Sequence, residues 1–226
     1  EEEMFLTSYL WEEAKHVEGF DRFLRTVAEA PGDLEHYFTE PYRTLFFEEL
    51  PTSMNALKTD TSPETVARAA VTYQMIVEGT LAETGYHAYY TVLEERGILP
   101  GMQQFIRNVQ RDESRHVGYG VFLLSRLVAE HGDQVWDVID ERMQELIMLA
   151  VSHIQETLGG YDPVPFGITP EDFVKYGMGQ FQKRFARIER ARSQTLEEVL
   201  YDGKSAPVAG DGATEDPGTT SASLPS

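Results

Sequence analysis

The sequence predicts an all-α protein in which long helices form a bundle. Apolar residues recur every three to four positions over stretches about twice the average helix length. No stretch shows the sustained alternation of a β-strand or the Asn-Gly pair of a tight hairpin. Long amphipathic helices without strands are typical of a helical bundle.

The first predicted helix covers about residues 2–29 and ends at the Pro-Gly pair 31–32. Its apolar residues keep the spacing of one helical face. The next segment, residues 34–61, is predicted to contain short helices and loops, because Pro41 and Pro51 interrupt the pattern.

A second long helix is predicted over residues 63–96. Ser62 supplies an N-cap hydroxyl, Pro63 stands at the first helical position, and Gly97 provides a stop at the end. At about 1.5 Å per residue, this helix would be about 50 Å long.

Three more helices are predicted at 100–131, 134–158 and 170–201. Gly132 ends the first of them, a glycine pair ends the second, and Thr169 caps the third. We therefore expect one bundle domain that covers most of the chain.

The last part of the chain has a different composition. From Gly203 to Ser226 it is rich in Gly, Pro, Ser, Ala and Thr, and only Val208 and Leu224 are large and apolar. Such a segment cannot bury enough surface to offset the entropy lost on ordering. We expect a bundle domain at 1–202 and a disordered tail at 203–226.

Composition excludes several classes of function. Nineteen Lys and Arg against 38 Asp and Glu give a net charge of −19, which disfavours binding to nucleic acid or to anionic membranes. The chain has no cysteine, so a bound metal would need Asp, Glu or His ligands. It has no run of about 18 apolar residues and no basic signal-peptide start. We expect a cytoplasmic protein without membrane insertion.

One short motif occurs twice on the predicted helices. Glu13 precedes His16 by three residues, and Glu113 precedes His116 by three residues. Residues three apart on a helix lie on one face, about 5–6 Å apart, so each pair could bind one metal ion. A single pair is common on solvated surfaces, but two copies on long helices are stronger evidence. Asp112 directly precedes the second motif and could orient a ligating imidazole.

Glu78 is a further candidate ligand, because it lies in the apolar middle of the 63–96 helix. Burying a carboxylate is costly unless it is paired or binds a metal. An ion pair with an Arg or a position on a polar seam is the alternative interpretation. Glu83 is a local rival that is more easily solvated, since Thr84 and Gly85 follow it.

This combination is typical of ferritin-like dimetal bundles, in which two helices each supply one Glu and two others each supply a Glu-x-x-His. The sequence provides both motifs and one of the two single glutamates. Glu1, Glu2 and Glu3 cannot supply the other, since they lie on the same helix as Glu13, about 15 Å away along its axis. The chain also lacks an initiator Met, and we expect its N-terminal part and first metal-ligand helix to be missing.

Three segments together resemble the ribonucleotide reductase small-subunit superfamily, and within it the ligand-binding oxidases. They are Trp11–His16, Tyr73–Tyr86 and Arg111–His116. The resemblance covers about residues 1–200. It implies a ferritin-like helical bundle of the ribonucleotide reductase small-subunit type, a manganese and iron (or two-iron) cofactor, and a homodimer.

The resemblance also implies roles for individual residues. Glu13 and His16 would serve one metal side, and Glu78, Glu113 and His116 the other. The protein would activate dioxygen beside a bound long-chain fatty acid.

In the ligand-binding oxidases a Tyr and a Val become joined by an ether cross-link, and Tyr73 occupies the matching Tyr position. Its Val partner would lie upstream of residue 1. Spacing alone does not suggest this role, because five residues on an α-helix rotate a side chain about 140° from Glu78. A structural aromatic is the independent interpretation of Tyr73.

Other functions remain open at this point. In reductase small subunits that use a tyrosyl radical, the Tyr lies four residues after the first ligating His, where this chain has Phe20. Their C-terminal tail carries an electron-relaying aromatic residue, and the tail after Gly203 has none. A reductase small subunit is thus less favoured. A fatty acyl desaturase-like enzyme and a non-catalytic metal-binding bundle are the further alternatives.

Overall fold

The computed structural model describes residues 2–30 and 32–205, and every regular element in these residues is helical. The predicted all-α bundle is confirmed. The main helices are α1 (Glu2–Thr26), α2 (Glu40–Arg43), α3 (Leu50–Ala56), α4 (Pro63–Ala70), α5 (Glu83–Arg96), α6 (Pro100–His131), α7 (Asp133–Gly159), α8 (Pro170–Arg190) and α9 (Leu196–Ser205). Single 3₁₀ turns lie at Glu35–Tyr37, Pro165–Gly167 and Ala191–Ser193. Within the described residues, no helix combines the length and apolarity needed to cross a membrane.

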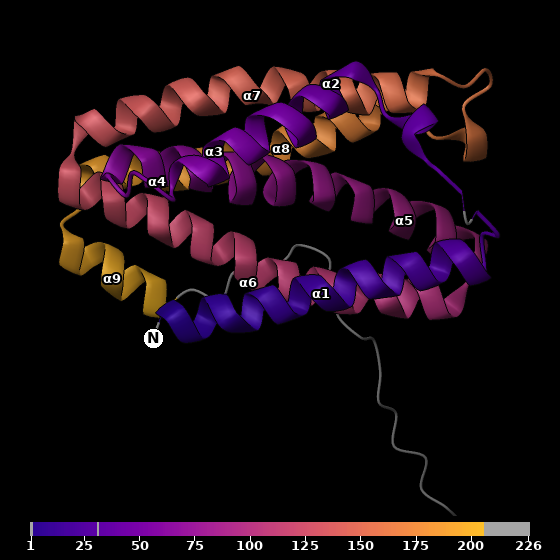
Figure 1. The fold of residues 1–226 in the computed structure, drawn as a ribbon, viewed down its shortest axis with the longest axis horizontal. Coiled ribbons are helices and arrows are strands. Elements are labelled where there is room, and N and C mark those ends of the chain that lie inside the picture. Colours follow the sequence, from indigo (N-terminus) through magenta and orange to yellow (C-terminus); the bar gives the residue numbers. More distant parts are fainter. Residues whose placement is uncertain (1, 31, 206–226) are drawn as a thin grey trace, which may run out of the picture.

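The long helices lie roughly side by side (Figure 1). α4 and α5 are joined by a π-helical segment, Val71–Ala82, called the π segment below, and together they form one continuous helix. The π segment packs between α6 and α7 and also contacts α8. α1 packs along α6 at the edge of the bundle.

Two apolar clusters fill the spaces between these helices. The larger joins the π segment, α6, α7 and α8. It includes the fully buried residues Met75, Leu124, Ile139 and Ile188. The smaller lies between α1, α5 and α6 around Tyr86 and Ile106. The candidate ligands lie on α1, the π segment and α6.

The predicted break at Pro51 is wrong. The chain is helical from Glu40 to Ala56, with a π-helical stretch, Thr44–Glu49, directly before that proline. A proline ring crowds the carbonyl four residues earlier in an α-helix, and the wider π turn relieves this clash. Pro41 stands in the first turn, where its missing N–H is not needed, and Thr39 caps that turn.

The end signals around the second long helix are confirmed. The Ser62 hydroxyl accepts a hydrogen bond from the Thr65 N–H, and Gly97 ends α5 with a left-handed φ of 61°. The prediction of an uninterrupted α-helix between them is wrong in one respect, because the middle is π-helical.

The single helix predicted at 170–201 is divided into α8 and α9. Gln194 is extended, and Thr195 starts a new helix by exchanging hydrogen bonds with Glu198. This Thr-x-x-Glu capping box was readable from the sequence. α9 continues to Ser205, and the rest of the predicted tail, 206–226, lies outside the described residues.

Candidate metal centre

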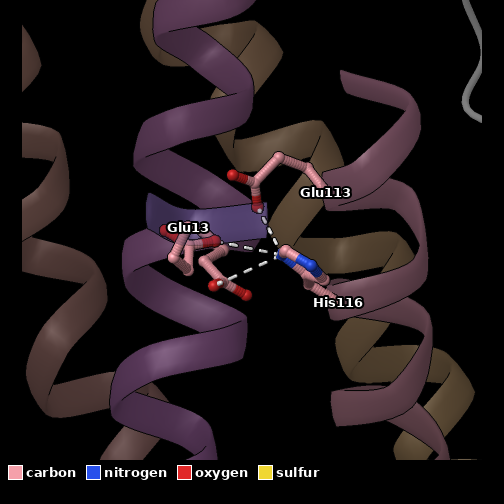
Figure 2. Close-up of side chains that lie close together, drawn as sticks. Glu13, Glu113 and His116 are labelled. Carbon is pink, nitrogen blue, oxygen red and sulfur yellow. Dashed lines mark ion pairs between the residues drawn. The ribbon is translucent and has the colours of Figure 1, made fainter. Parts of the chain in front are cut away.

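Four candidate ligands from three separate elements meet inside the bundle. Glu13 comes from α1, Glu78 from the π segment, and Glu113 and His116 from α6. One potential ligand atom from each lies within 4.8 Å of those of the others. Figure 2 shows Glu13 and Glu113 pointing toward His116, whose Nδ1 is 3.2 Å from Glu13 Oε1 and 3.5 Å from Glu113 Oε2.

His16 lies at the edge of the same cluster. Its Nδ1 is 3.3 Å from Glu113 Oε1 and 3.6 Å from Glu13 Oε1. All five residues predicted as metal ligands are therefore brought together, although they are spread over more than 100 positions of the chain.

Each of the five residues has one buried atom without a hydrogen-bond partner. These atoms are Glu13 Oε1, His16 Nδ1, Glu78 Oε2, Glu113 Oε2 and His116 Nδ1. Leaving a buried polar atom unpaired costs about 1–3 kcal/mol, so five in one place require an explanation. Carboxylate oxygens and imidazole nitrogens that converge in this way are the donors that manganese and iron bind. The donor set fits a dimetal site.

The other nitrogen of each imidazole faces a carboxylate from the opposite helix. His116 Nε2 is 2.9 Å from Glu12 Oε2, and His16 Nε2 is 3.4 Å from Asp112 Oδ2. Asp112 was expected to orient an imidazole. It contacts His16 of the first motif, rather than the histidine of the motif that it precedes. Glu12 was missed, although the sequence carries the signal, since an acid directly precedes both Glu-x-x-His motifs.

One arginine joins these two carboxylates. Arg115 donates hydrogen bonds to Glu12 Oε1 and, at 2.7 Å, to Asp112 Oδ1. Lys15 Nζ adds a hydrogen bond of 3.1 Å to Asp112 Oδ2. Such outer contacts hold each imidazole in one orientation, with Nδ1 directed into the cluster.

Two tyrosines, neither of them predicted, hold carboxylates of the cluster. The Tyr9 ring stacks on His116 with centroids 3.6 Å apart, and its hydroxyl donates to Glu78 Oε1. The Tyr86 hydroxyl donates to Glu113 Oε1 at 3.1 Å. No sequence pattern distinguished Tyr9 from the other tyrosines of the chain.

Tyr73 also faces the cluster. Its ring stacks with Tyr9 at a centroid distance of 6.0 Å. Burial and then the nearby charge of Glu78 raise the pKa of Tyr73. In a π-helix, backbone hydrogen bonds join residues five apart, so Tyr73 and Glu78 lie one turn from each other rather than on different faces.

Residues 1–181 match the family model described as "Ribonucleotide reductase, small chain". The chain belongs to this family. Among solved structures, it is 33% identical to an R2-like ligand-binding oxidase with an aerobically reconstituted Mn/Fe cofactor, with a TM-score of 0.77. The match covers 81% of this chain and 66% of that one.

Two further solved structures are similar to this small-chain family member. One is the R2-like ligand-binding oxidase from Sulfolobus acidocaldarius, at 34% identity and a TM-score of 0.75, with 86% of this chain and 66% of that chain covered. The other is an R2-like ligand-binding oxidase without metal cofactor, at 33% identity and a TM-score of 0.77. That match covers 81% of this chain and 70% of the other. The predicted resemblance and the ferritin-like bundle of the ribonucleotide reductase type are confirmed.

Opposite charges in the candidate site stabilise one another. Burial opposes the charged forms of Glu13, His16 and His116, but the close approach of carboxylates and imidazoles, at 3.2–3.6 Å, outweighs it. The pKa of Glu13 falls to about 2, and the pKa values of His16 and His116 rise to about 9 and about 10. Burial and then the charge of Glu113 raise the pKa of Glu78 to about 8.

We expect metal binding to release protons near pH 7. In the metal-free protein, His16, His116 and Glu78 have pKa values above 7 and hold protons, whereas metal ligation requires the unprotonated atoms. The affinity for Mn(II) should therefore increase as pH rises from 7 to 9. Calorimetric titration in buffers of different ionisation enthalpy measures the release, and binding at pH 7 without net proton release would contradict the expectation.

Removing an orienting carboxylate should weaken metal binding without removing a ligand. Glu12→Ala and Asp112→Ala should each lower the affinity for Mn(II) by about 10–100-fold, because each imidazole loses the contact that fixes its ring. Glu18→Ala is a matched control on α1, since Glu18 is exposed and forms a surface ion pair with Arg22. Equal affinity in all three variants would show that these carboxylates do not orient the imidazoles.

Proposed function

We propose that this protein is a dimetal oxidase that holds manganese and iron, or two irons, and activates dioxygen. The observation that carries the proposal is the convergence of five buried atoms without hydrogen-bond partners, all from carboxylate or imidazole groups. The family membership and the Mn/Fe cofactor named for a similar oxidase support the same assignment.

Glu13 and His16 would hold one metal, and Glu78, Glu113 and His116 the other. Two reduced metals held there would supply the electrons for the reduction of dioxygen. Carboxylates suit such a site because they are hard, anionic ligands that can bind one ion or bridge two. The protein keeps water from most of the cluster, since His116 is fully buried and Glu78 and Glu113 are each 3% exposed, whereas the Glu13 side chain is 30% exposed.

Reconstitution tests this proposal. Purified protein is loaded anaerobically with Mn(II) and Fe(II), and its metal content is measured before oxygen is admitted. We expect about two metals per chain in a complete site and uptake of dioxygen on mixing. A protein that retains no metal after desalting, and consumes no more dioxygen than buffer containing the same metals, would overturn the proposal.

We further propose a long-chain fatty acid as the ligand beside the metals. Similar structures are named ligand-binding oxidases. In this chain Tyr86 belongs to the smaller apolar cluster and donates to Glu113, so apolar surface lies next to the ligand set. Organic extraction of the purified protein followed by mass spectrometry should recover a fatty acid in stoichiometric amount. Its absence from protein with full metal content would contradict this assignment.

Cross-linking at Tyr73 is a separate prediction from the same proposal. After exposure to oxygen with manganese and iron, the peptide that contains Tyr73 should be linked to a valine peptide, with loss of one hydrogen from each partner. The orientation of Tyr73 toward the cluster, beside Tyr9, supports this reaction. Peptide mass spectrometry detects the link, and Tyr73→Phe is the control that should abolish it. An unmodified Tyr73 peptide in fully metallated, oxidised protein would contradict the prediction.

We also propose that the protein acts as a cytoplasmic homodimer. The outward side of α1 exposes a row of large apolar residues, which a second copy could cover. They are Met4, Leu10, Trp11 and Val17, each at least 64% exposed. Light scattering of the purified protein at micromolar concentration would distinguish a dimer from a monomer.

A further inference from the structure

The backbone of the π segment is contacted by a buried arginine from another helix. Arg184 of α8 has a side chain that is only 14% exposed, and its Nη1 donates a hydrogen bond to the carbonyl of Gly79. Its Nη2 lies 3.6 Å from Glu83 Oε1. Burying a guanidinium is costly, so its contact with a helix backbone suggests a role beyond packing.

The contact falls where the helix changes its hydrogen-bond pattern. The Glu83 N–H donates to the carbonyl of Glu78, five residues earlier, and also to that of Thr80, and α5 begins at that point. At the end of a π-helical stretch, backbone hydrogen bonds change from residues five apart to residues four apart. One backbone carbonyl at this transition receives no hydrogen bond from a backbone N–H of the helix. The next carbonyl in line is that of Gly79, and Arg184 donates to it.

Gly79 is the residue type that this approach requires. A Cβ atom on Gly79 would lie 3.3 Å from both Cδ and Nε of Arg184, and 2.7 Å from the carbonyl oxygen of Gln74. A larger residue would therefore clash with the Gln74 carbonyl and crowd the Arg184 side chain. The absence of a side chain at Gly79 lets Arg184 of α8 reach the backbone and stabilise the π turn.

The π turn in turn directs the candidate ligand. Glu78 directly precedes Gly79, and its Oε2 is one of the five unpaired atoms of the cluster. The same π pattern brings Tyr73 to the side of Glu78 that faces Tyr9.

We propose that Arg184 is a positioning residue for the metal centre. By donating to the Gly79 carbonyl, it keeps the π segment in the pattern that turns Glu78 toward Glu13, Glu113 and His116. The inference rests on the proposed function for its link to metal, but the contact with the π segment can be tested without metal.

The test compares Arg184→Gln and Arg184→Lys with wild type, using Arg190→Gln, an exposed position on the same helix, as the matched control. Circular dichroism and thermal melting show whether each variant folds. Hydrogen exchange of the amides at 79–84 is then measured in metal-free protein, and the affinity for Mn(II) alone is measured by calorimetry.

Arg184→Gln has a shorter, neutral side chain that should no longer hold the Gly79 carbonyl, and this loss should weaken Mn(II) binding by about tenfold or more, in the range seen for lost outer contacts of metal ligands. In folded Arg184→Gln, we expect this loss together with faster exchange at 79–84 and unchanged exchange in α7. Arg184→Lys, which keeps a charged donor on a long side chain without the planar fork, should fall between Arg184→Gln and wild type in both measurements. If Arg184→Gln does not fold, the comparison of Arg184→Lys with wild type and Arg190→Gln tests the proposal.

The proposal is overturned if a folded Arg184 variant matches Arg190→Gln in both exchange and affinity. It is also overturned if Arg184→Lys, while folded, is as impaired as Arg184→Gln. A wild-type protein that binds no Mn(II) would instead contradict the proposed function, and the exchange measurement would still decide whether Arg184 holds the π segment.

Discussion

Replacing His116 with alanine should abolish the stabilisation of the protein by metal. The variant loses the Nδ1 atom that lies between Glu13 and Glu113, so we expect Mn(II) to bind at least a hundredfold more weakly. At a metal concentration of about 100 times the wild-type Kd, wild type gains about 2.7 kcal/mol and such a variant only about 0.4 kcal/mol. Thermal melting with and without Mn(II) measures the difference.

His131→Ala is the matched control for this experiment. His131 lies at the end of the same helix, α6, and is 41% exposed in its side chain. It should keep the full metal-dependent stabilisation and the dioxygen uptake of wild type. If His116→Ala and His131→Ala gain equal stability from Mn(II), the cluster around His116 is not the metal site.

Arg142→Ala, outside the candidate metal centre, should destabilise the fold by about 1.5–3 kcal/mol. The Arg142 side chain is 3% exposed and joins α7 to two other parts of the bundle. Its guanidinium contacts Glu49 at 2.7 Å, Ser53 at 3.0 Å and Thr72 at 3.2 Å. Alanine removes the charged donor from the buried hydroxyls of Ser53 and Thr72 and from the partly exposed Glu49 carboxylate, so urea denaturation should show a lower free energy of unfolding.

Arg68→Ala tests whether burial causes this effect. Arg68 and Arg142 both pair with Glu145 at 3.2 Å, but the Arg68 side chain is 41% exposed. An exposed ion pair contributes about 0–1 kcal/mol, so this variant should remain close to wild type. Equal losses in the two arginine variants would contradict the buried-network explanation.

Both Glu-x-x-His motifs could be placed from the sequence because a helix fixes the relation between residues three apart. The same holds for the helix ends at Ser62 and Gly97, where the signal is carried by one or two neighbouring residues. The reciprocal contacts of Glu12 with His116 and of Asp112 with His16 were only partly predicted. They join residues 104 and 96 positions apart, so spacing along one helix could not pair them.

Tyr73 shows where local reasoning failed. On an α-helix its side chain would point away from Glu78, and the sequence gives no sign that this helix is π-helical between Val71 and Ala82. The π pattern is accompanied by contacts that the linear sequence does not reveal. These include the guanidinium of Arg184 against the Gly79 carbonyl and the close approach that the glycine allows.

The sequence by itself determined that the protein is a bundle of long helices, that two of them carry Glu-x-x-His pairs, and that Glu78 is a candidate ligand. These features depend on periodicity and on residues within one or two turns, which are local properties of the chain. Only the tertiary structure decided that five ligand atoms meet without other partners, that each imidazole faces a carboxylate of the opposite motif, and that a π turn directs Glu78 and Tyr73 to the same place. The physical reason is that these arrangements depend on packing between α1, the π segment, α6 and α8, and helical periodicity does not specify which faces of separate helices will meet.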